Sequence, residues 1–244
     1  MSAAASTSSV SLVTGGVRGL GLAVARAMRE RGDRVHVVYR SSRDLARELE
    51  HEFPGRVHRA DALEAGALDG VVAAVRERDG RLDHLIHAVG EYLTGPLESC
   101  EPADLRRMLA SNVESSFLAF RAARSQLRAS RGSAVFFGCA GLDGLRARRQ
   151  TAAYTAAKSA LLVLMRSLAV EEAPHGVRIN MVSPGQVPHE HASSDTRDPE
   201  LWERIPLGRP GTPEDVARTV VWLASPGSSY VTGADIDVAG GWML

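Results

Sequence analysis

The sequence predicts a doubly wound α/β fold, in which about seven parallel strands form one sheet with helices on both faces. Short runs rich in apolar residues alternate along the chain with longer segments that carry apolar residues three or four positions apart. The short runs are nearly continuous in apolar character, as expected for parallel strands that are covered on both faces. At 244 residues the chain is long enough to bury a sizeable core.

Each expected element follows from its local pattern. In chain order, the expected strands are residues 9–14 (SVSLVT), 34–39 (RVHVVY), 56–60 (RVHRA), 83–89 (DHLIHAV), 133–138 (SAVFFG), 177–182 (VRINMV) and 234–238 (ADIDV). The expected helices are residues 19–31, 42–52, 64–78, 103–129, 152–172 and 213–224. The first of these helices places Leu20, Val24, Ala27 and Met28 on one face, as an amphipathic helix does.

The chain has no break in composition and no repeat, so a single domain spanning residues 1–244 is expected. Residues 1–9 are small and polar, which predicts a flexible lead rather than a signal peptide. Residues 184–212 lack clear periodicity. A stretch of that length inside a compact fold is typical of a functional loop, and we expect a substrate lid there.

Charge and cysteine content narrow the class of protein. The 29 Lys and Arg balance the 29 Asp and Glu, so no nucleic acid partner is expected, and no apolar run has the length of a membrane span. The two cysteines, Cys100 and Cys139, have no metal-ligand spacing, which favours free thiols and a cytoplasmic location. The run His189-Glu190-His191 fits a solvated loop better than a metal site, and no metal is predicted.

A glycine-rich turn follows the first expected strand and begins the first expected helix. It reads Thr14-Gly15-Gly16-Val17-Arg18-Gly19-Leu20-Gly21. A helix N-terminus presents unpaired N–H groups to a phosphate, and glycines let the backbone approach it closely. The turn therefore predicts a dinucleotide site, although a tight strand-to-helix connection is the simpler alternative.

The end of the second expected strand bears on which dinucleotide is bound. An NAD site usually has Asp or Glu there, whereas the sequence has Tyr39-Arg40-Ser41-Ser42. Arg40 and Arg18 are suited to a 2′-phosphate, which predicts NADP(H). The alternative is that both arginines are solvated surface residues.

Tyr154 and Lys158 are four residues apart near the start of an expected helix, so they share one face. An ammonium group close to a phenol is expected to lower the pKa of Tyr154 from its ordinary value of about 10. Such a phenol is suited to exchange a proton with a carbonyl or hydroxyl group. A helix-surface pair is the alternative for these two residues alone.

Further motifs stand in order around this pair: Asp61-Ala62, Asn112 in SNVESSF, Arg178-Ile179-Asn180, Ser183-Pro184-Gly185, IPLGRPGTPEDVA and YVTGADIDVAGG. From about Val10 to the C-terminus the chain resembles the short-chain dehydrogenase/reductase family, in particular its 3-oxoacyl-carrier-protein reductase-like members. TGGVRGLG is similar to the family's TGxxxGxG, and Tyr154 with Lys158 is similar to its YxxxK. The resemblance implies a Rossmann-like fold and an NADP(H)-dependent oxidoreductase.

The resemblance implies a role for each catalytic residue. Tyr154 passes a proton to the substrate oxygen, Lys158 holds the nicotinamide ribose and lowers the pKa of Tyr154, and Asn112 positions a water. The expected cofactor-contacting residues are Gly15, Arg18, Gly19, Leu20, Gly21, Arg40, Ser41, Asp61, Ala62, Ala88, Gly90, Tyr154, Lys158, Pro184, Gly185 and Val187. The expected substrate is a small ketone, such as a 3-oxoacyl thioester, and the expected assembly is a homotetramer or homodimer.

The chain departs from the family where a Ser usually stands, about thirteen residues before the Tyr. Counting back from Tyr154 gives Gly141, whereas aligning the strand GSAVFFGC gives Cys139 and a loop two residues longer. A thiol is a weaker hydrogen-bond donor than a hydroxyl, so Cys139 is a weak fourth member of the catalytic set. The alternative function is therefore an NADP(H)-binding sensor or scaffold with little turnover.

Two other features carry open alternatives. The segment His87-Ala88-Val89-Gly90 replaces the family's NNAG, and we interpret His87 as a structural residue rather than a proton-transfer group. Arg146, Arg148 and Arg149 lie near the expected substrate mouth. They form either a solvated turn or a contact for an anionic partner, such as a phosphopantetheine carrier or coenzyme A.

Overall fold

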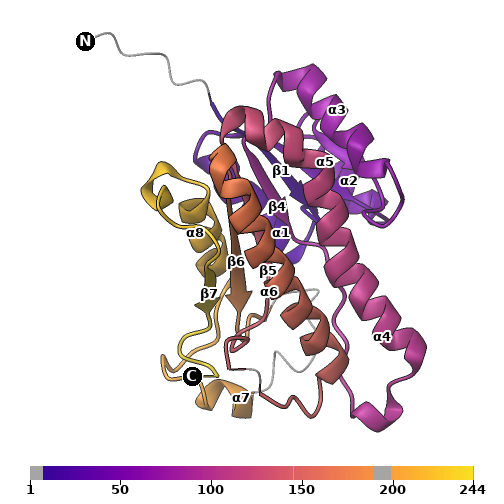
Figure 1. The fold of residues 1–244 in the computed structure, drawn as a ribbon, viewed down its shortest axis with the longest axis vertical. Helices are drawn as coiled ribbons and strands as arrows, with labels where there is room; N and C mark the ends of the chain where they lie inside the picture. Colours follow the sequence, from indigo (N-terminus) through magenta and orange to yellow (C-terminus); the bar gives the residue numbers. More distant parts are fainter. Residues whose placement is uncertain (1–7, 145, 189–198, 244) are drawn as a thin grey trace.

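The computed structural model describes residues 8–144, 146–188 and 199–243, and these form one seven-stranded, all-parallel sheet in the order β3-β2-β1-β4-β5-β6-β7 (Figure 1). Strand order reverses between β1 and β4, since β2 and β3 extend to one side of β1 and β4 to β7 to the other. This is the doubly wound, Rossmann-like sheet that the sequence predicts. All seven expected strands are present.

The elements that the sequence predicts are found within a few residues of their expected ranges, except at one helix. The strands are β1 Val10–Thr14, β2 Arg34–Tyr39, β3 Val57–Arg59, β4 His84–His87, β5 Ser133–Phe137, β6 Arg178–Pro184 and β7 Asp235–Val238. The α-helices are α1 Gly19–Glu30, α2 Arg43–Leu49, α3 Ala67–Asp79, α4 Pro102–Leu109, α5 Ser115–Ser130, α6 Ala152–Glu172, α7 Pro199–Glu203 and α8 Pro213–Leu223.

The exception is the helix expected over residues 103–129, which is divided by a π-helical turn, Ala110–Glu114. Helix α4 precedes this turn and α5 follows it. A π turn inserts one residue into the helical ladder, and such turns are frequent at functional sites. Apolar periodicity does not register a one-residue insertion, so the sequence predicts a single helix. Asn112 lies within the turn.

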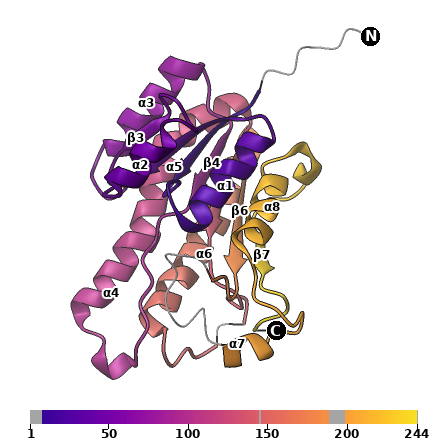
Figure 2. The ribbon, with the colours of Figure 1, turned by 180° about the vertical axis from the view of Figure 1, so that it is seen from behind.

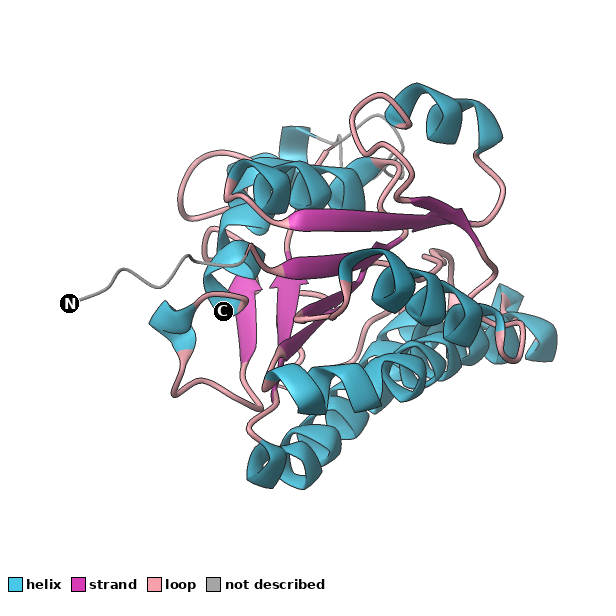
Figure 3. Cartoon of the chain, turned by 90° about the horizontal axis from the view of Figure 1, so that it is seen from above, coloured by secondary structure: helices cyan, strands magenta, loops and turns pink. Residues whose placement is uncertain are grey.

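Helices cover both faces of the sheet (Figures 2 and 3). On one face α3, α5 and α6 pack on alternate strand residues such as Ala134 and Phe136 of β5. On the other face α1, α2 and α8 pack on the intervening residues, such as Val135 and Phe137. Because both faces are buried, the strands need apolar residues at consecutive positions, which explains their continuous apolar character.

Helix α6 with the turn after it, Ala152–His175, is long and apolar enough to cross a membrane, and it is the only such helix in the described ranges. By length and composition this corrects the expectation that no segment qualifies. Its buried residues contact the sheet, and its buried Glu172 is paired with Arg124 and Arg128 of α5. These are features of a core helix, and core helices meet the same length criterion.

The expected lid region, 184–212, contains the end of β6 and the short helix α7. Helix α7 was not expected. The His189–His191 run and the rest of residues 189–198 lie outside the described residues, as do residues 1–7 of the expected lead. The lid thus stays a prediction.

Candidate active site

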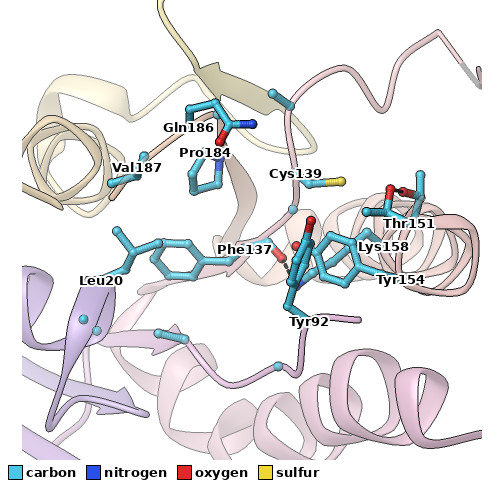
Figure 4. A pocket seen from close by; sticks show the side chains of 18 of the residues that line it. Leu20, Tyr92, Phe137, Cys139, Thr151, Tyr154, Lys158, Pro184, Gln186 and Val187 are labelled. Carbon is cyan, nitrogen blue, oxygen red and sulfur yellow. Dashed lines mark hydrogen bonds between the residues drawn. The ribbon is translucent and has the colours of Figure 1, made fainter. Parts of the chain in front are cut away.

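A cavity of about 490 Å³ opens at the carboxyl ends of the strands, beside the point where strand order reverses (Figure 4). Ligands of doubly wound folds bind at this position. The predicted site residues that line it are Gly15, Arg18, Gly19, Leu20, Gly21, Ala88, Gly90, Cys139, Tyr154, Lys158, Pro184, Gly185 and Val187. A smaller cavity of about 180 Å³ shares part of this wall and is also lined by Arg40, Ser41, Asp61 and Ala62.

The glycine turn leaves no room for side chains where it meets the sheet. A Cβ atom on Gly15, whose φ is +70°, would lie 2.6 Å from the Ala88 carbonyl oxygen, and one on Gly21 would collide with the Gly15 carbonyl. The N–H groups of Gly15 and Gly16 donate to the Val38 carbonyl at 2.9 and 3.2 Å, which ties the turn to β2. These contacts explain the glycines and hold the turn beside the start of α1.

Helix α1 begins at Gly19, with Arg18 at its N-cap. Arg18 makes no side-chain capping bond, and the first turn of α1 contains no acidic residue. The N–H groups and the partial positive charge of the helix N-terminus therefore lie at the cavity wall without a neutralising carboxylate in that turn. This arrangement fits a pyrophosphate.

Arg18, Arg40 and Ser41 meet in the smaller cavity, as a site for a 2′-phosphate requires. The strand end contributes no carboxylate, but Asp61, after β3, lies 4.0 Å from the Arg40 guanidinium. Both of these side chains are well exposed, so the pair is weak. The sequence did not indicate this contact, because it joins the ends of two separate strands.

Tyr154 and Lys158 stand on one face of α6 and enter the cavity together (Figure 4). The Lys158 ammonium lies 5.6 Å from the centre of the Tyr154 ring and donates a 2.7 Å hydrogen bond to the Phe137 carbonyl. Burial lowers the pKa of Lys158 to about 8. The amine is therefore fixed between β5 and the phenol.

The expected lowering of the Tyr154 pKa is wrong for this structure. Burial raises the pKa of the Tyr154 hydroxyl well above its usual value, and the neighbouring Cys139 and Tyr92 raise it further. Spacing along a helix shows that a lysine is near, but it does not show how far both groups are withdrawn from water. At neutral pH the phenol thus holds its proton.

Asn112 is fully buried behind the cavity wall. Its amide Nδ2 donates to the Glu91 and Met108 carbonyls, both at 3.0 Å, and so ties the π turn to the segment after β4. Its Oδ1 atom has no hydrogen-bond partner among the described residues and packs against Gly90, close to Lys158. The predicted water-positioning role stays a prediction.

Cys139, rather than Gly141, faces Tyr154. Cys139 is two residues beyond β5 and lines the main cavity, whereas Gly141 lies outside it and donates its N–H to Asp237 at 3.1 Å. Burial raises the pKa of the Cys139 thiol to about 11. The group beside the phenol is therefore a neutral thiol, which donates only weak hydrogen bonds.

His87 has the structural environment that we expect for it. Its Nδ1 atom is 2.7 Å from the Thr14 hydroxyl, and its Nε2 atom is 3.1 Å from the Ser115 hydroxyl. Burial, and then the charge of Lys158, lowers the pKa of His87 to about 3. The ring stays neutral and joins β1 to the start of α5.

The sequence did not predict five further residues that line the cavity, namely Tyr92, Thr151, Gln186, Trp242 and Met243. The Tyr92 ring contacts the Tyr154 ring edge-on, with centroids 4.8 Å apart (Figure 4). Tyr92 closely follows β4, so the rule that ligands bind beyond the carboxyl ends of strands was the signal that could have found it. Among the described residues, no group of three His, Cys, Asp or Glu side chains is placed to hold a metal ion.

Comparison with known proteins agrees with this geometry. A family model described as enoyl-(acyl carrier protein) reductase matches residues 15–243. The 2-(S)-hydroxypropyl-CoM dehydrogenase 3 of Xanthobacter autotrophicus is 34% identical over 94% of this chain and 94% of its own length. The galactitol 2-dehydrogenase (L-tagatose-forming) of Cereibacter sphaeroides is 33% identical over 95% of this chain and 94% of its own.

Solved structures show the same architecture. A blue fluorescent protein from a metagenomic library, crystallised with NADPH, superposes on this chain with a TM-score of 0.88 at 30% sequence identity. The aligned region covers 97% of this chain and 98% of the fluorescent protein. A short-chain dehydrogenase/reductase from Serratia marcescens superposes with a TM-score of 0.87 at 31% identity, with the same coverage. At this identity and coverage, the similarity extends beyond the sheet to the whole chain.

Proposed function

This chain belongs to the short-chain dehydrogenase/reductase family of oxidoreductases, and from that premise we propose that it uses NADPH to reduce a ketone to a secondary alcohol. The observation that carries the proposal is one shared cavity. The phenol of Tyr154 and the amine of Lys158 share it with the glycine turn that is suited to a dinucleotide. A proton donor and a cofactor site thus face the same space.

The residues present fit NADP(H). The start of α1 offers N–H groups to the pyrophosphate, and the missing Cβ atoms of Gly15 and Gly21 leave the space that a close backbone approach needs. Arg18 and Arg40 are suited to the 2′-phosphate, and Pro184, Gly185 and Val187 to the nicotinamide. The preference for NADP(H) over NAD(H) depends on these two arginines.

The bound cofactor supplies the hydride. Tyr154, which is protonated at neutral pH, donates a proton to the substrate oxygen as that oxygen becomes an alkoxide, because an alkoxide is a much stronger base than a phenolate. Lys158 lies beside the phenol, and its positive charge stabilises the phenolate that remains after the transfer. Cys139 contributes a weak hydrogen bond to the same oxygen. Asn112 braces the wall behind Lys158.

The substrate that we propose is a small carbonyl compound, with a 3-oxoacyl thioester as one member of the class. The two relatives described above are named for a hydroxypropyl thioether and for a sugar alcohol, both of which bear secondary hydroxyl groups. We also propose closure of the lid region over this substrate, a homotetramer or homodimer, and a cytoplasmic location. The exposed apolar Phe117, Val163 and Val170 on α5 and α6 support association through these helices.

A second candidate is an NADP(H) sensor or scaffold, and Cys139 is the observation that favours it. The thiol stands where an oxygen donor is expected. Against this candidate, Tyr154 and Lys158 both point into the cavity, and a pure sensor has no need of a proton donor.

The test measures NADPH binding by fluorescence and NADPH oxidation by absorbance on one preparation. The panel contains 3-oxoacyl thioesters, quinones, simple ketones and oxo acids, and NADH is the matched cofactor. Turnover with at least one ketone, faster with NADPH than with NADH, is the expected result. Tight NADPH binding without turnover on any member of the panel would favour the sensor.

A further inference from the structure

Arg148 carries a positive charge on the wall of the catalytic cavity, away from the glycine turn. It lines the main cavity together with Cys139 and Tyr154. It also lines an adjoining hollow of about 220 Å³ with Thr155 and Ser159 of α6. That hollow contains none of the predicted cofactor-contacting residues. Arg148 therefore stands on the substrate side of the site.

Two backbone contacts hold the Arg148 guanidinium in place. One of its terminal nitrogens donates to the Ala140 and Gly141 carbonyls, both at 2.9 Å. Its Nε atom is buried and has no hydrogen-bond partner among the described residues. No described residue satisfies this donor, and the guanidinium held in this position presents its positive charge to a group that enters the cavity.

Arg148 makes no ion pair with any carboxylate in the described part of the chain, unlike Arg107 and Arg166. Burial raises the pKa of the Asp237 carboxyl on β7, and the charge of Arg148 offsets a small part of that rise. Asp237, however, accepts the Gly141 N–H at 3.1 Å. Asp143 also faces Asp237, and its own partner is Arg166.

Among the described residues, the wall beside Arg148 is polar but not acidic. The Thr151 and Thr155 hydroxyls, 3.2 Å apart, both line the main cavity. The first turn of α6 contains no acidic residue. A group that enters beside Arg148 and these threonines thus meets a cation and, because one hydroxyl donates to the other, one free hydroxyl donor. Tyr154 directly precedes Thr155 and lines the same cavity.

We propose that Arg148 binds an anionic oxygen-bearing group of the substrate, so that the enzyme selects oxo acids or oxo phosphonates over neutral ketones. This inference rests on the proposed reductase function and narrows its substrate class. Arg148 acts as a specificity-determining residue, because it places the ketone oxygen of an anionic substrate near Tyr154. A neutral ketone gains nothing from it.

The experiment compares charged and neutral partners of the same ketone with NADPH. One arm pairs 4-oxopentanoate with its methyl ester, and the other pairs 2-oxopropylphosphonate with its dimethyl ester. The wild type is expected to prefer the charged partner in at least one arm. Arg148→Met should lower kcat/KM for that anion roughly 10- to 100-fold and change the ester by no more than about twofold.

Two further variants serve as controls. Arg149→Met removes an exposed arginine that lines neither cavity beside Tyr154 and should leave both partners unchanged. Arg148→Lys keeps the charge but not the planar fork and should retain part of the preference, which also guards against a folding defect in Arg148→Met. NADPH affinity and melting temperature are measured for each variant and should equal those of the wild type.

A binding measurement separates this inference from the reductase proposal. Calorimetry on the NADP⁺-loaded protein should show that 4-oxopentanoate or 2-oxopropylphosphonate binds at least about tenfold more weakly to Arg148→Met than to the wild type. This readout requires no turnover, so it holds even if no ketone is reduced. A wild type that prefers the esters, or equal losses for anion and ester in Arg148→Met, would overturn the role of Arg148.

Discussion

The two halves of the crevice are built from different parts of the chain. The phosphate half consists mainly of backbone, with the glycine turn after β1 held against β2 and β4. The reaction half consists of side chains from several loops and from α6, namely Tyr92, Cys139, Arg148, Tyr154 and Lys158. The shape of the phosphate half therefore depends on the absence of side chains, and the chemistry of the reaction half depends on which side chains line it.

This difference between the two halves indicates which positions of the molecule can accept other residues. In the phosphate half a single added Cβ at Gly15 or Gly21 meets carbonyl oxygen, so this region has little freedom to change. In the reaction half Cys139 and Arg148 occupy loop positions outside the strands of the sheet. A fold of this kind thus keeps one cofactor site while its substrate chemistry changes.

The largest expected effect comes from removing the proton donor of the reaction half. Tyr154→Phe should lower kcat by at least about 1000-fold, because hydride transfer then leaves an unprotonated alkoxide. NADPH affinity should change by no more than about twofold, since the phosphate half is untouched. Stopped-flow absorbance measures the first quantity and fluorescence titration the second.

Tyr92→Phe is the matched control for that change. Its ring contacts Tyr154 edge-on, and the substitution removes a phenol hydroxyl from the same cavity. A loss of no more than about tenfold is expected, because general acid catalysis requires only one proton donor. Equal losses in the two variants would contradict the assignment of the proton to Tyr154.

The next largest effect is expected in the phosphate half, at the two arginines of the smaller cavity. Replacing Arg18 and Arg40 together by Ala should reduce the ratio of kcat/KM for NADPH over NADH roughly 10- to 100-fold, because both guanidinium groups line the cavity assigned to the 2′-phosphate. Arg47→Ala, which removes an exposed arginine of α2, should leave the ratio unchanged. A ratio unaffected by the double change would show that the arginines are only solvated surface residues.

The same contrast explains how much the sequence could predict. The strands could be predicted from local patterns, because burial on both faces requires apolar residues at consecutive positions. The glycine turn could be predicted as well, because the collision at Gly21 involves Gly15 of the same short segment. The place of Arg148 and Tyr92 depends on the paths of the loops after β5 and β4, and those loops have no periodicity. The Asp61 contact with Arg40 likewise joins two strand ends, and no local pattern encodes it.

His87 joins β1 to α5 beside the smaller cavity, through Thr14 and Ser115, and gives the third prediction. Its pKa falls from an unfolded value of about 6.5 to about 3 in the fold, so the folded state keeps the ring neutral. Stability from this residue is full above pH 6.5 and declines as the pH falls toward 3. The loss is about 1.4 kcal/mol per pH unit within that window.

His87→Asn isolates this contribution, because His36 and His84, the other buried histidines among the described residues, are present in both proteins. Urea unfolding at pH 7, 6, 5 and 4 should show that the free energy of unfolding of the wild type falls more steeply than that of the variant. The difference in slope should be about 1.4 kcal/mol per pH unit. Parallel curves would mean that His87 carries its charge in the folded state.

The smallest expected effect sharpens the reaction half at Cys139. A hydroxyl donates a stronger hydrogen bond than a neutral thiol to the oxygen that becomes negative during reduction. Loss of a full donor at such a position costs on the order of 100-fold, and the thiol supplies part of that stabilisation, so Cys139→Ser should raise kcat by about five- to tenfold. Cys100→Ser, at a half-buried position outside both cavities beside the catalytic residues, should leave kcat unchanged. NADPH affinity should stay constant in both variants, because the change is confined to the substrate side. If kcat does not rise, the hydroxyl that binds the substrate oxygen lies outside the loop from 139 to 150, which contains no Ser, Thr or Tyr, and Thr151, which lines the same cavity, becomes the donor to replace next.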